Sequence, residues 1–431
     1  MELSHMIILL ILLGTMATYI PVFMCLFFTS VLGVIFFTDL PILLLIQSLF
    51  RSMDKFALVV VLFFILCGNI MTAGSIVEKL IKVANALVSW LPGGLGMAGI
   101  LACGLFGAIS GSTVATVVAL GGFMIPALLD NGYPERYTLG LMTTSPNLGV
   151  IIPPSIGMIL YSMISNVSLE GLFLTGFLPG LLIMSSTCIY TYFFFRKKTE
   201  IVRMPIPSTI EVLIILKEGF WSLMLPIIIF GGIFSGAFTA NEAAVVACVY
   251  AFIVELFIHR SMKLRDVKRI TVNSAVTSAT LLIIVAGATC FGRLLTLENI
   301  PGAITQTVLS TIHSPIIFLL AMNILLLVVG MFMDIISATM ILGPVFLPML
   351  DAFNISWMHF GLIMTVNLAI GYCTPPMGVS LYITGAIANR DIIYVSRAVL
   401  PFLAIQTAIL LFITYFPDMV LWLPSAMGFL E

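Results

Sequence analysis

Two short segments of this apolar chain bring amide, hydroxyl and proline residues together. They are residues 144–155, which contain Asn147 and the pair Pro153-Pro154, and residues 367–376, which also end in a double proline. A double proline removes two backbone donors and breaks a helix. Inside a membrane, a broken backbone is tolerated only where protein or a water-filled cavity satisfies it. Paired breaks of this kind are typical of the binding site of a transporter.

A second polar interruption lies upstream of each break. Upstream of the first break, the interruption is residues 110–113, Ser-Gly-Ser-Thr. Upstream of the second break, it begins at Asp334. The apolar arms on either side of residues 110–113 are short for a membrane span, and an intramembrane Asp is costly unless it is paired, hydrated or cation-bound. The pattern predicts two re-entrant hairpins followed by two broken helices: hairpins at about 97–129 and 316–350, and broken helices at about 138–165 and 357–386.

The residue types at these points favour cation and carboxylate binding. Unwound carbonyls and side-chain oxygens suit a hard cation such as Na⁺, and the N-termini of half-helices suit a carboxylate. A proton pump is less attractive, because no Lys or His relay lies at mid-membrane. The predicted sodium sites are Ser110, Ser112, Asn147 and carbonyls near Gly149 for the first, and Asp334, Ser337, Asn367 and Thr374 for the second. The predicted contacts of a substrate carboxylate are Ser112, Thr113, Ser145 and Ser155.

Composition decides the class of protein that must position these residues. Of 431 residues, 61% are hydrophobic and 9% are charged, against roughly 45–50% and 25% in soluble proteins. This excludes a water-soluble enzyme and a disordered chain, and a net charge of −1 offers no footprint for nucleic acid. The seven single cysteines show no C-x-x-C spacing and the four histidines are far apart, so we expect no cofactor and no metal besides sodium. The sequence predicts an all-α polytopic membrane protein.

The basic residues predict its orientation. Ten of the 18 Lys and Arg lie between residues 196 and 269, in clusters at Arg196-Lys197-Lys198 with Arg203 and at 260–269. The positive-inside rule places both clusters in the cytoplasm. The stretch between them must therefore cross the membrane twice, at about 218–234 and 237–258.

The chain also resembles itself when it is shifted by 222 residues. This shift pairs Pro126 with Pro348, both prolines of the first break with those of the second, and Ser112 with Asp334. A two-residue gap pairs Asn147 with Asn367. We interpret this as an internal duplication and predict three parts: a first membrane half at 1–203, connecting helices with basic segments at 204–272, and a second membrane half at 273–431.

Several motifs in order resemble the large membrane subunit of TRAP (tripartite ATP-independent periplasmic) transporters. They are Leu91-Pro92-Gly93-Gly94-Leu95, Ser110-Gly111-Ser112, the segment 147–154, Phe230-Gly231-Gly232-Ile233 with 239–244, Gly330-Met331-Phe332-Met333-Asp334, and 366–371 with Thr374-Pro375-Pro376. The similarity covers essentially the whole chain. One departure is visible, because the family often carries Asp where this chain has Thr116, and this puts in doubt any cation-binding role assigned there by analogy.

The resemblance implies a fold and a function. The fold has two inverted repeats, with elevator-type transport and scaffold domains, and the protein sits in the bacterial inner membrane. The function is sodium-driven import of an organic acid, chiefly a C4-dicarboxylate or sialic acid. The implied partners are a periplasmic substrate-binding protein and a small four-helix membrane subunit, here expected to be a separate chain.

Three alternatives remain open at this point. The nearest is a stand-alone sodium/dicarboxylate symporter that works without a binding protein. A non-transporting membrane scaffold has no need of paired broken helices. An intramembrane enzyme needs a catalytic pair facing a cavity, and only the isolated Asp334 and Glu242 are available.

Overall fold

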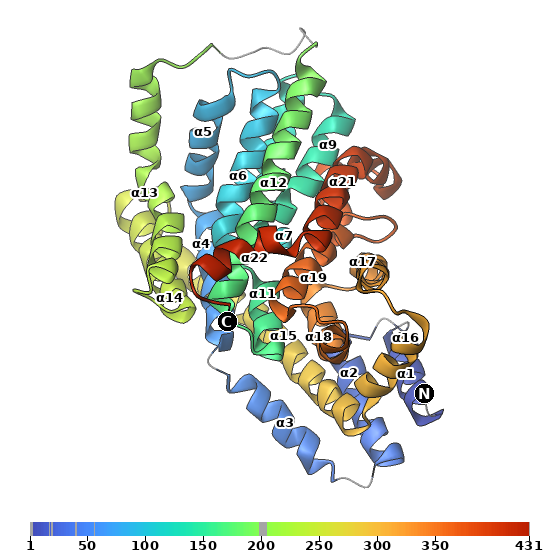
Figure 1. Cartoon of the computed structure of the whole chain (residues 1–431). Helices are drawn as coiled ribbons and strands as arrows, with labels where there is room; N and C mark the ends of the chain where they lie inside the picture. The colour runs from blue at the N-terminus through green and yellow to red at the C-terminus, as the bar shows by residue number, and fades with distance from the viewer. Residues whose placement is uncertain are drawn as a thin grey trace.

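The computed structural model describes residues 3–16, 18, 20–38, 41–55, 57–197 and 205–430. Lys198 and Arg203 of the first basic cluster, and the predicted boundary between residues 203 and 204, lie outside these residues. Every regular element of the described chain is helical (Figure 1). Nine helices of this part are long and apolar enough to cross a membrane, so the chain is an all-α, multi-pass membrane protein.

The helices form two series of similar order. The first series comprises α1 (Leu3–Met16), α2 (Val22–Phe37), α3 (Leu43–Met53), α4 (Ala57–Ala73), α5 (Ile76–Val88), α6 (Gly94–Ser110), α7 (Thr113–Thr116), the π-helical turn η1 (Val117–Gly121), α8 (Gly122–Asp130), α9 (Glu135–Thr144), the 3-10 turn η2 (Ser145–Asn147), α10 (Leu148–Ile151), α11 (Ile156–Ser165) and α12 (Leu169–Phe195).

The second series repeats this order with fewer interruptions. It comprises α13 (Thr209–Phe234), α14 (Ala240–Ile253), the π-helical turn η3 (Val254–Ile258), α15 (Leu264–Leu297), α16 (Ile300–Thr311), α17 (Pro315–Phe332), α18 (Ile335–Ala352), α19 (Trp357–Gly371), α20 (Val379–Ala388) and α21 (Ile392–Tyr415), and α22 (Pro417–Ala426) follows it.

The spacing between equivalent helices matches the shift found in the sequence. Helix α7 begins at Thr113 and α18 at Ile335, 222 residues later; α9 begins at Glu135 and α19 at Trp357, again 222 residues later. In this order α13 and α14 correspond to α1 and α2, and α15 corresponds to α3 with α4. The second series therefore begins at Thr209, whereas the division predicted from the sequence assigns residues 204–272 to a connector.

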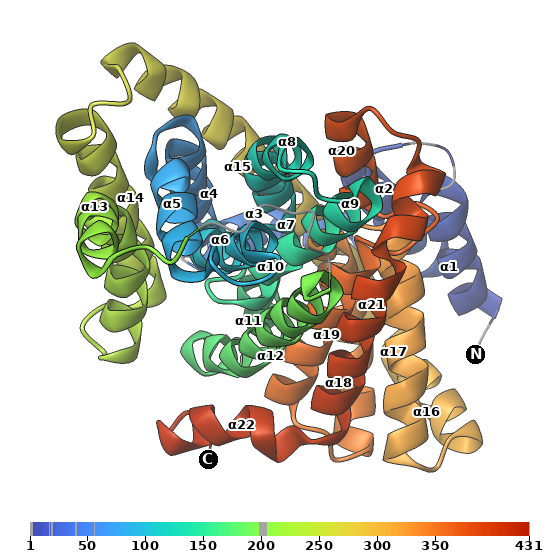
Figure 2. The ribbon, with the colours of Figure 1, turned by 90° about the horizontal axis from the view of Figure 1, so that it is seen from above.

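The helices pack in two groups. The support group consists of α1–α4 and α13–α15, in which α4 packs on α14 and α15 packs on α2, α3 and α4. The tip group consists of α6–α12 and α17–α21, in which α9 packs on α21, α17 on α19 and α11 on α18. Helix α5 contacts α6 of the tip group and α13 of the support group, and α16 contacts α18 and α15 in the same way. Figure 2 shows α13 and α14 at one edge of the molecule and α1 and α2 at the opposite edge.

Two pairs of glycines let helices of the tip group approach closely. A Cβ atom on Gly107 of α6 would lie 2.4 Å from the Cα of Gly149 in α10, and one on Gly371 of α19 would lie 2.6 Å from the Cα of Gly330 in α17. Real Cβ atoms do not come so close to a backbone. Glycine is therefore required at both helix crossings, one in each half.

A buried carboxylate joins the two series where α5 meets the support group. Glu255 in η3 is fully buried and accepts hydrogen bonds from the backbone N–H groups of Ser75 (2.8 Å) and Ile76 (2.7 Å), where α5 begins. The hydroxyl of Ser261 donates to the same side chain. The carboxylate thus satisfies N–H groups that a helix start leaves without partners. Burial and the charge of Lys79 lower the pKa of the neighbouring His259, and the nearby Glu255 carboxylate opposes this shift.

Candidate functional site

The first hairpin turns at Gly111. Helix α6 ends at Ser110, and Gly111 has a φ of +62°, in the left-handed region that favours glycine. The side chain of Ser112 then accepts a hydrogen bond from the N–H of Ala115 and caps the next helix. That helix runs without a break through η1 and α8, from Thr113 to Asp130.

The second hairpin turns at Asp334. Its carboxylate caps α18 by accepting hydrogen bonds from the N–H of Ser337 (2.9 Å) and from the Ser337 hydroxyl. Asp is among the preferred N-cap residues, because its oxygen satisfies an N–H that has no partner within the helix. The sequence prediction that pairs Ser112 with Asp334 corresponds in the structure to two equivalent caps.

Each break is hydrogen-bonded to the tip of its own hairpin. In the first half, the N–H of Ile156 at the start of α11 donates to the carbonyl of Gly111 (3.3 Å). In the second half, the N–H of Ile335 at the start of α18 donates to the hydroxyl of Tyr372 (2.8 Å). Double prolines at 153–154 and 375–376 interrupt the helices at these positions. The tips and breaks predicted from the sequence therefore meet in space.

A cavity of about 430 Å³ lies where the tips face the support group. The first residues of three helices line it: Thr113 of α7, Ile156 of α11 and Ile335 of α18. The hydroxyl of Thr113 is buried and has no hydrogen-bond partner. Helices α4, α7 and α11, which contribute to its lining, lie near the middle of the molecule in Figure 1. Its polar side chains are Asn69, Thr72, Ser110, Ser112, Thr113, Thr277 and Tyr372.

Three of the four residues of the first predicted sodium site meet around Thr116. The Thr116 hydroxyl donates to the carbonyl of Ser112 (2.7 Å) and lies 3.3 Å from the hydroxyl of Ser110. It also lies against Gly149, where a Cβ atom would come within 2.4 Å of it. The cluster is built from hydroxyl and carbonyl oxygens, the ligand type that Na⁺ prefers, and it contains no carboxylate.

Asn147 faces away from this cluster. Its amide donates to Gln406 in α21 (2.8 Å), and its carbonyl accepts from the thiol of Cys373 in the second break (3.3 Å). Gln406 in turn donates to the carbonyl of Thr144 (2.9 Å). Asn147 thus joins the two breaks to α21 instead of completing the first oxygen cluster.

The second predicted sodium site is divided in the same way. Asp334 and Ser337 bond to each other at the tip. Asn367 instead donates to the side-chain oxygen of Asn323 in α17 (2.7 Å), and its own carbonyl oxygen is buried without a partner. Thr374 donates to the carbonyl of Ile370 within the break (2.8 Å).

The register of the glycine pairs explains why Asn147 and Asn367 are not equivalent. Asn147 lies two residues before Gly149, and Asn367 lies four residues before Gly371. At about 100° per residue, two residues turn a helix by roughly 200° and four by roughly 400°. Asn367 therefore lies on the face that meets α17, whereas Asn147 lies on the opposite face, toward α21. The gap that pairs the two asparagines in the sequence does not preserve their position on the helix.

Two of the predicted substrate contacts lie outside the cavity lining. Ser112 and Thr113 line it, but Ser145 and Ser155 do not. Ser155 is buried, and its side chain accepts a hydrogen bond from the N–H of Met158 at the start of α11. Ser145 is buried and its hydroxyl has no partner.

Several polar residues of this region were missed in the sequence analysis. They are Asn69, Tyr372 and Gln406, together with Asn323, which bonds to Asn367. Asn69, Asn323 and Gln406 are isolated amides within apolar helices. A polar residue inside a membrane helix is a functional hypothesis by default, and that signal was available for all three.

Comparison with known proteins gives a consistent result. The profile of the family described as "Tripartite ATP-independent periplasmic transporter, DctM component" matches residues 9–419. The chain is 36% identical over 439 residues to the C4-dicarboxylate TRAP transporter large permease protein DctM of Rhodobacter capsulatus, covering 99% of this chain and 100% of that protein. It is 34% identical to the sialic acid TRAP transporter large permease protein SiaM of Vibrio cholerae, covering 96% of each.

Among solved structures, the fold is similar to that of the YdaH transporter of Alcanivorax borkumensis. The TM-score is 0.62, the sequence identity is 15%, and the match covers 87% of this chain and 88% of that one. At this identity the similarity concerns the fold alone.

Proposed function

The chain belongs to the DctM-component family of tripartite ATP-independent periplasmic transporters, and from that premise we propose that it imports an organic acid into the cell, driven by a sodium gradient. The family assignment makes it the large permease component of a three-part transporter in the bacterial inner membrane. The proposed substrate is a C4-dicarboxylate or sialic acid, the anions named for the relatives above.

The observation that carries the proposal is the cavity at the hairpin tips. Three helix N-termini reach it, and each carries a partial positive charge and N–H groups that suit a carboxylate. Its volume of about 430 Å³ lies within the roughly 300–1,000 Å³ of typical ligand pockets. The unpartnered hydroxyl of Thr113 is available to a ligand oxygen.

Sodium coupling is supported by the two oxygen clusters beside this cavity. The first consists of Ser110, the Ser112 carbonyl and Thr116, and the second of Asp334 and Ser337. A carboxylate at the tip of a membrane hairpin is costly unless a cation or water compensates it. We propose that Na⁺ at these clusters holds the tips in the shape that binds the anion.

An elevator movement is supported by the division into support and tip groups. The tip cavity is lined by Thr277 and Leu281 near the middle of α15, and by residues of α4 from its middle, at Ile65, to Thr72 near its end. Helix α15 begins within the basic cluster at 260–269, which the positive-inside rule places in the cytoplasm. In the proposed cycle this arrangement is the inward-facing state, in which the tips are near the cytoplasmic half of the support group.

The proposed partners are a small membrane subunit and a periplasmic substrate-binding protein. The test is uptake of labelled succinate and of labelled sialic acid by proteoliposomes that contain the chain with its small subunit. Uptake is measured with and without an inward sodium gradient, with a potassium gradient as the control, and with and without the matching binding protein.

Uptake that requires both sodium and the binding protein would support the proposal and identify the substrate class. Sodium-driven uptake without the binding protein would identify a stand-alone symporter instead. Equal uptake in sodium and potassium would exclude sodium coupling, and no uptake of either acid would exclude these two substrates.

A further inference from the structure

A second cavity, of about 630 Å³, lies farther along the seam between the support and tip groups. The support group contributes residues of α3 and the second half of α15, and the tip group contributes residues of α11 and α18. Its polar side chains include Lys55, Asn166, Thr289 and Arg293. Among the residues that the structure describes, no Asp or Glu lines it.

The two cations of this cavity are free to meet a ligand. Lys55 and Arg293 are both exposed, and within the described part of the chain neither forms an ion pair with a carboxylate. The ionisable residues nearest to them in sequence are Arg51, Asp54 and Glu298. An isolated cation at the end of a membrane helix ordinarily extends to water or to lipid headgroups. Two such cations around one cavity also fit an anionic ligand.

The positive-inside rule, applied to the start of α15, assigns the cavity to the periplasmic side of the seam. Helix α15 has 34 residues and is about 51 Å long at 1.5 Å per residue, which exceeds the roughly 30 Å of the hydrocarbon core. It begins beside the cytoplasmic basic cluster, so Arg293, four residues before its end, lies near the opposite surface. An arginine here runs against the positive-inside tendency, which favours a role for this charge beyond orientation.

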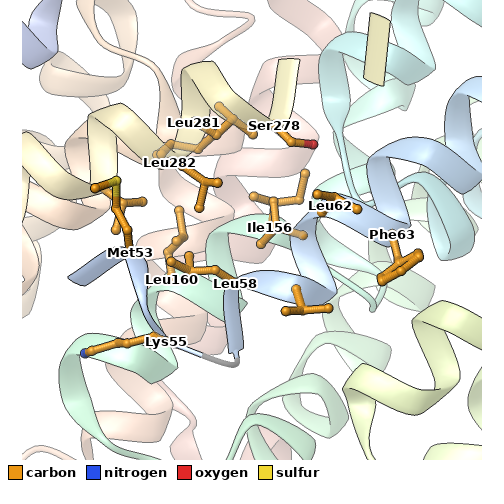
Figure 3. A pocket seen from close by; sticks show the side chains of 14 residues that line it. Met53, Lys55, Leu58, Leu62, Phe63, Ile156, Leu160, Ser278, Leu281 and Leu282 are labelled. Atoms are coloured by element: carbon orange, nitrogen blue, oxygen red, sulfur yellow. The ribbon is translucent and has the colours of Figure 1, made fainter. Parts of the chain in front are cut away.

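An apolar chamber of about 340 Å³ lies between the two polar cavities. It shares Lys55 and Val285 with the periplasmic cavity, and Ile156, Leu281 and Ile336 with the tip cavity. Figure 3 shows its apolar side chains around the centre and Lys55 apart from them, at the rim. The three spaces therefore follow one another along the surface over which the tip group would slide.

We propose that the cavity lined by Lys55 and Arg293 is a second anion-binding site, which receives a carboxylate ligand from the periplasm before the ligand reaches the hairpin tips. The inference rests on the proposed function for the identity of the ligand. A guanidinium binds a carboxylate through two parallel hydrogen bonds, and a lysine ammonium adds a compact charge. From Leu281 to Arg293 is 12 residues of α15, or roughly 18 Å, so the two sites are separate and occupied in turn.

The first test measures uptake by the complete transporter in proteoliposomes, with succinate as the probe. For Arg293→Gln with Lys55→Gln, we expect the KM for external succinate to rise about tenfold while the maximal rate changes less than about twofold. The conservative pair Arg293→Lys and Lys55→Arg should keep most of the affinity. Arg51→Gln is the matched control, because this exposed cation on α3 does not line the cavity.

The second test reads the charge of the cavity without any transport. Thr289→Cys places a thiol in the lining, and its modification by an anionic methanethiosulfonate is compared with that by a cationic one. The seven native cysteines are buried or half-buried, and their reaction is subtracted with the unsubstituted chain. We expect the anionic reagent to be favoured, and the preference to fall about tenfold when both cations are replaced by Gln.

The two tests separate the failure of this proposal from the failure of the proposed function. If succinate is not transported at all, the proposed substrate is wrong, but the labelling ratio still decides whether the cavity concentrates anions. An unchanged KM, a loss of maximal rate alone, or a ratio that is insensitive to Lys55 and Arg293 would each overturn the second site. Slower labelling in the presence of succinate supports it, whereas slowing that depends only on added phosphatidylglycerol would assign the cations to lipid headgroups and overturn it.

Discussion

At the first hairpin tip the new helix begins with a serine cap, at Ser112, whereas at the second it begins with an aspartate cap, at Asp334. The surrounding backbone is alike, since each tip is hydrogen-bonded to its own break and each hairpin crosses the broken helix at a pair of glycines. The oxygen cluster at the first tip is neutral and the cluster at the second carries a carboxylate.

This difference shows that a duplicated backbone can hold two unequal oxygen clusters, and the sodium sites proposed there would be unequal in the same way. Hydroxyl and carbonyl oxygens of the first tip offer only dipoles to Na⁺, whereas Asp334 offers a full charge in a medium of low dielectric, where Coulomb interactions are strong. We therefore expect the second site to bind sodium more tightly and to account for most of the coupling.

The largest effect is expected from removing the charge of Asp334. Asn keeps a helix cap of similar quality, so Asp334→Asn tests the charge and not the fold. We expect sodium-driven uptake to fall about 100-fold, which corresponds to about 2.7 kcal/mol, with the concentration of sodium for half-maximal uptake raised. Asp351→Asn, at the other end of α18, is the matched control and should retain activity. If Asp334→Asn and the unsubstituted chain had the same half-maximal sodium concentration, the expectation of unequal sites would be contradicted.

The next effect is expected from the two asparagines. Asn147→Ala leaves the side-chain oxygen of Gln406 without its donor, and Asn367→Ala does the same to the side-chain oxygen of Asn323. An unsatisfied buried polar group costs about 1–3 kcal/mol, and we expect roughly tenfold slower uptake in each variant. Because Asn147 and Asn367 donate to different side chains, the two losses should be close to additive in the double variant. Because neither asparagine lies in a proposed sodium cluster, the half-maximal sodium concentration should stay unchanged in both variants. A raised value would contradict the division of the predicted sodium sites described above.

The glycine crossings give a comparison of stability. Gly149→Ala places a methyl group 2.4 Å from the Thr116 hydroxyl, whereas nothing lies within 4 Å of a Cβ atom on Gly122. Overpacking typically costs about 1–3 kcal/mol, so we expect Gly149→Ala to lower the apparent Tm of the purified complex by several degrees. Gly122→Ala should leave it unchanged or slightly raised. Equal Tm values for both variants would show that the contact between Gly149 and Thr116 tolerates a side chain.

A smaller effect is expected from Thr116, the residue at the centre of the first cluster. Thr116→Val removes one hydroxyl and keeps the shape of the side chain. We expect the half-maximal sodium concentration to rise about three- to fivefold, because one neutral oxygen is worth about 1 kcal/mol. Thr116→Ser is the control and should remain near the unsubstituted value. A change as large as that of Asp334→Asn would mean that the two tips contribute equally.

The smallest effect is expected from the protonation of His259 in the support group, because it leaves both tips intact. The pKa of His259 is lowered in the folded chain, mainly by burial, so the folded state binds fewer protons than the unfolded state below about pH 6.5. Folding is therefore not penalised by His259 above that pH, where the ring is neutral in both states. As the pH falls toward 5, protonation of the unfolded state lowers the free energy of unfolding. We expect the apparent Tm to decrease by about 2 °C over this range, and less in His259→Gln. The same pH dependence in both proteins would contradict this assignment.

The sequence predicted the repeat and the position of each tip because these features depend on local chemistry. Double prolines interrupt a helix wherever they occur, and Ser112 and Asp334 cap helices in an otherwise apolar chain. The hydrogen-bond partners of Asn147 and Asn367 could not be predicted from the sequence, because the direction of each side chain depends on its register with the glycine crossings. Gln406 lies 259 residues from Asn147, and without an alignment nothing in a single sequence links the two. Thr116 stood out only as a departure from the family, although the structure places it at the centre of its cluster.

The bond between Glu255 and the start of α5 has a consequence for how the protein is made. The carboxylate that satisfies the N–H groups of Ser75 and Ile76 lies about 180 residues downstream. A bacterial ribosome that adds about 5–20 residues per second needs roughly 9–36 s to reach it. Throughout that interval the first helices are in the membrane while the start of α5 depends on water or on the insertion machinery. Assembly of the first half is therefore completed only after α14 has been inserted.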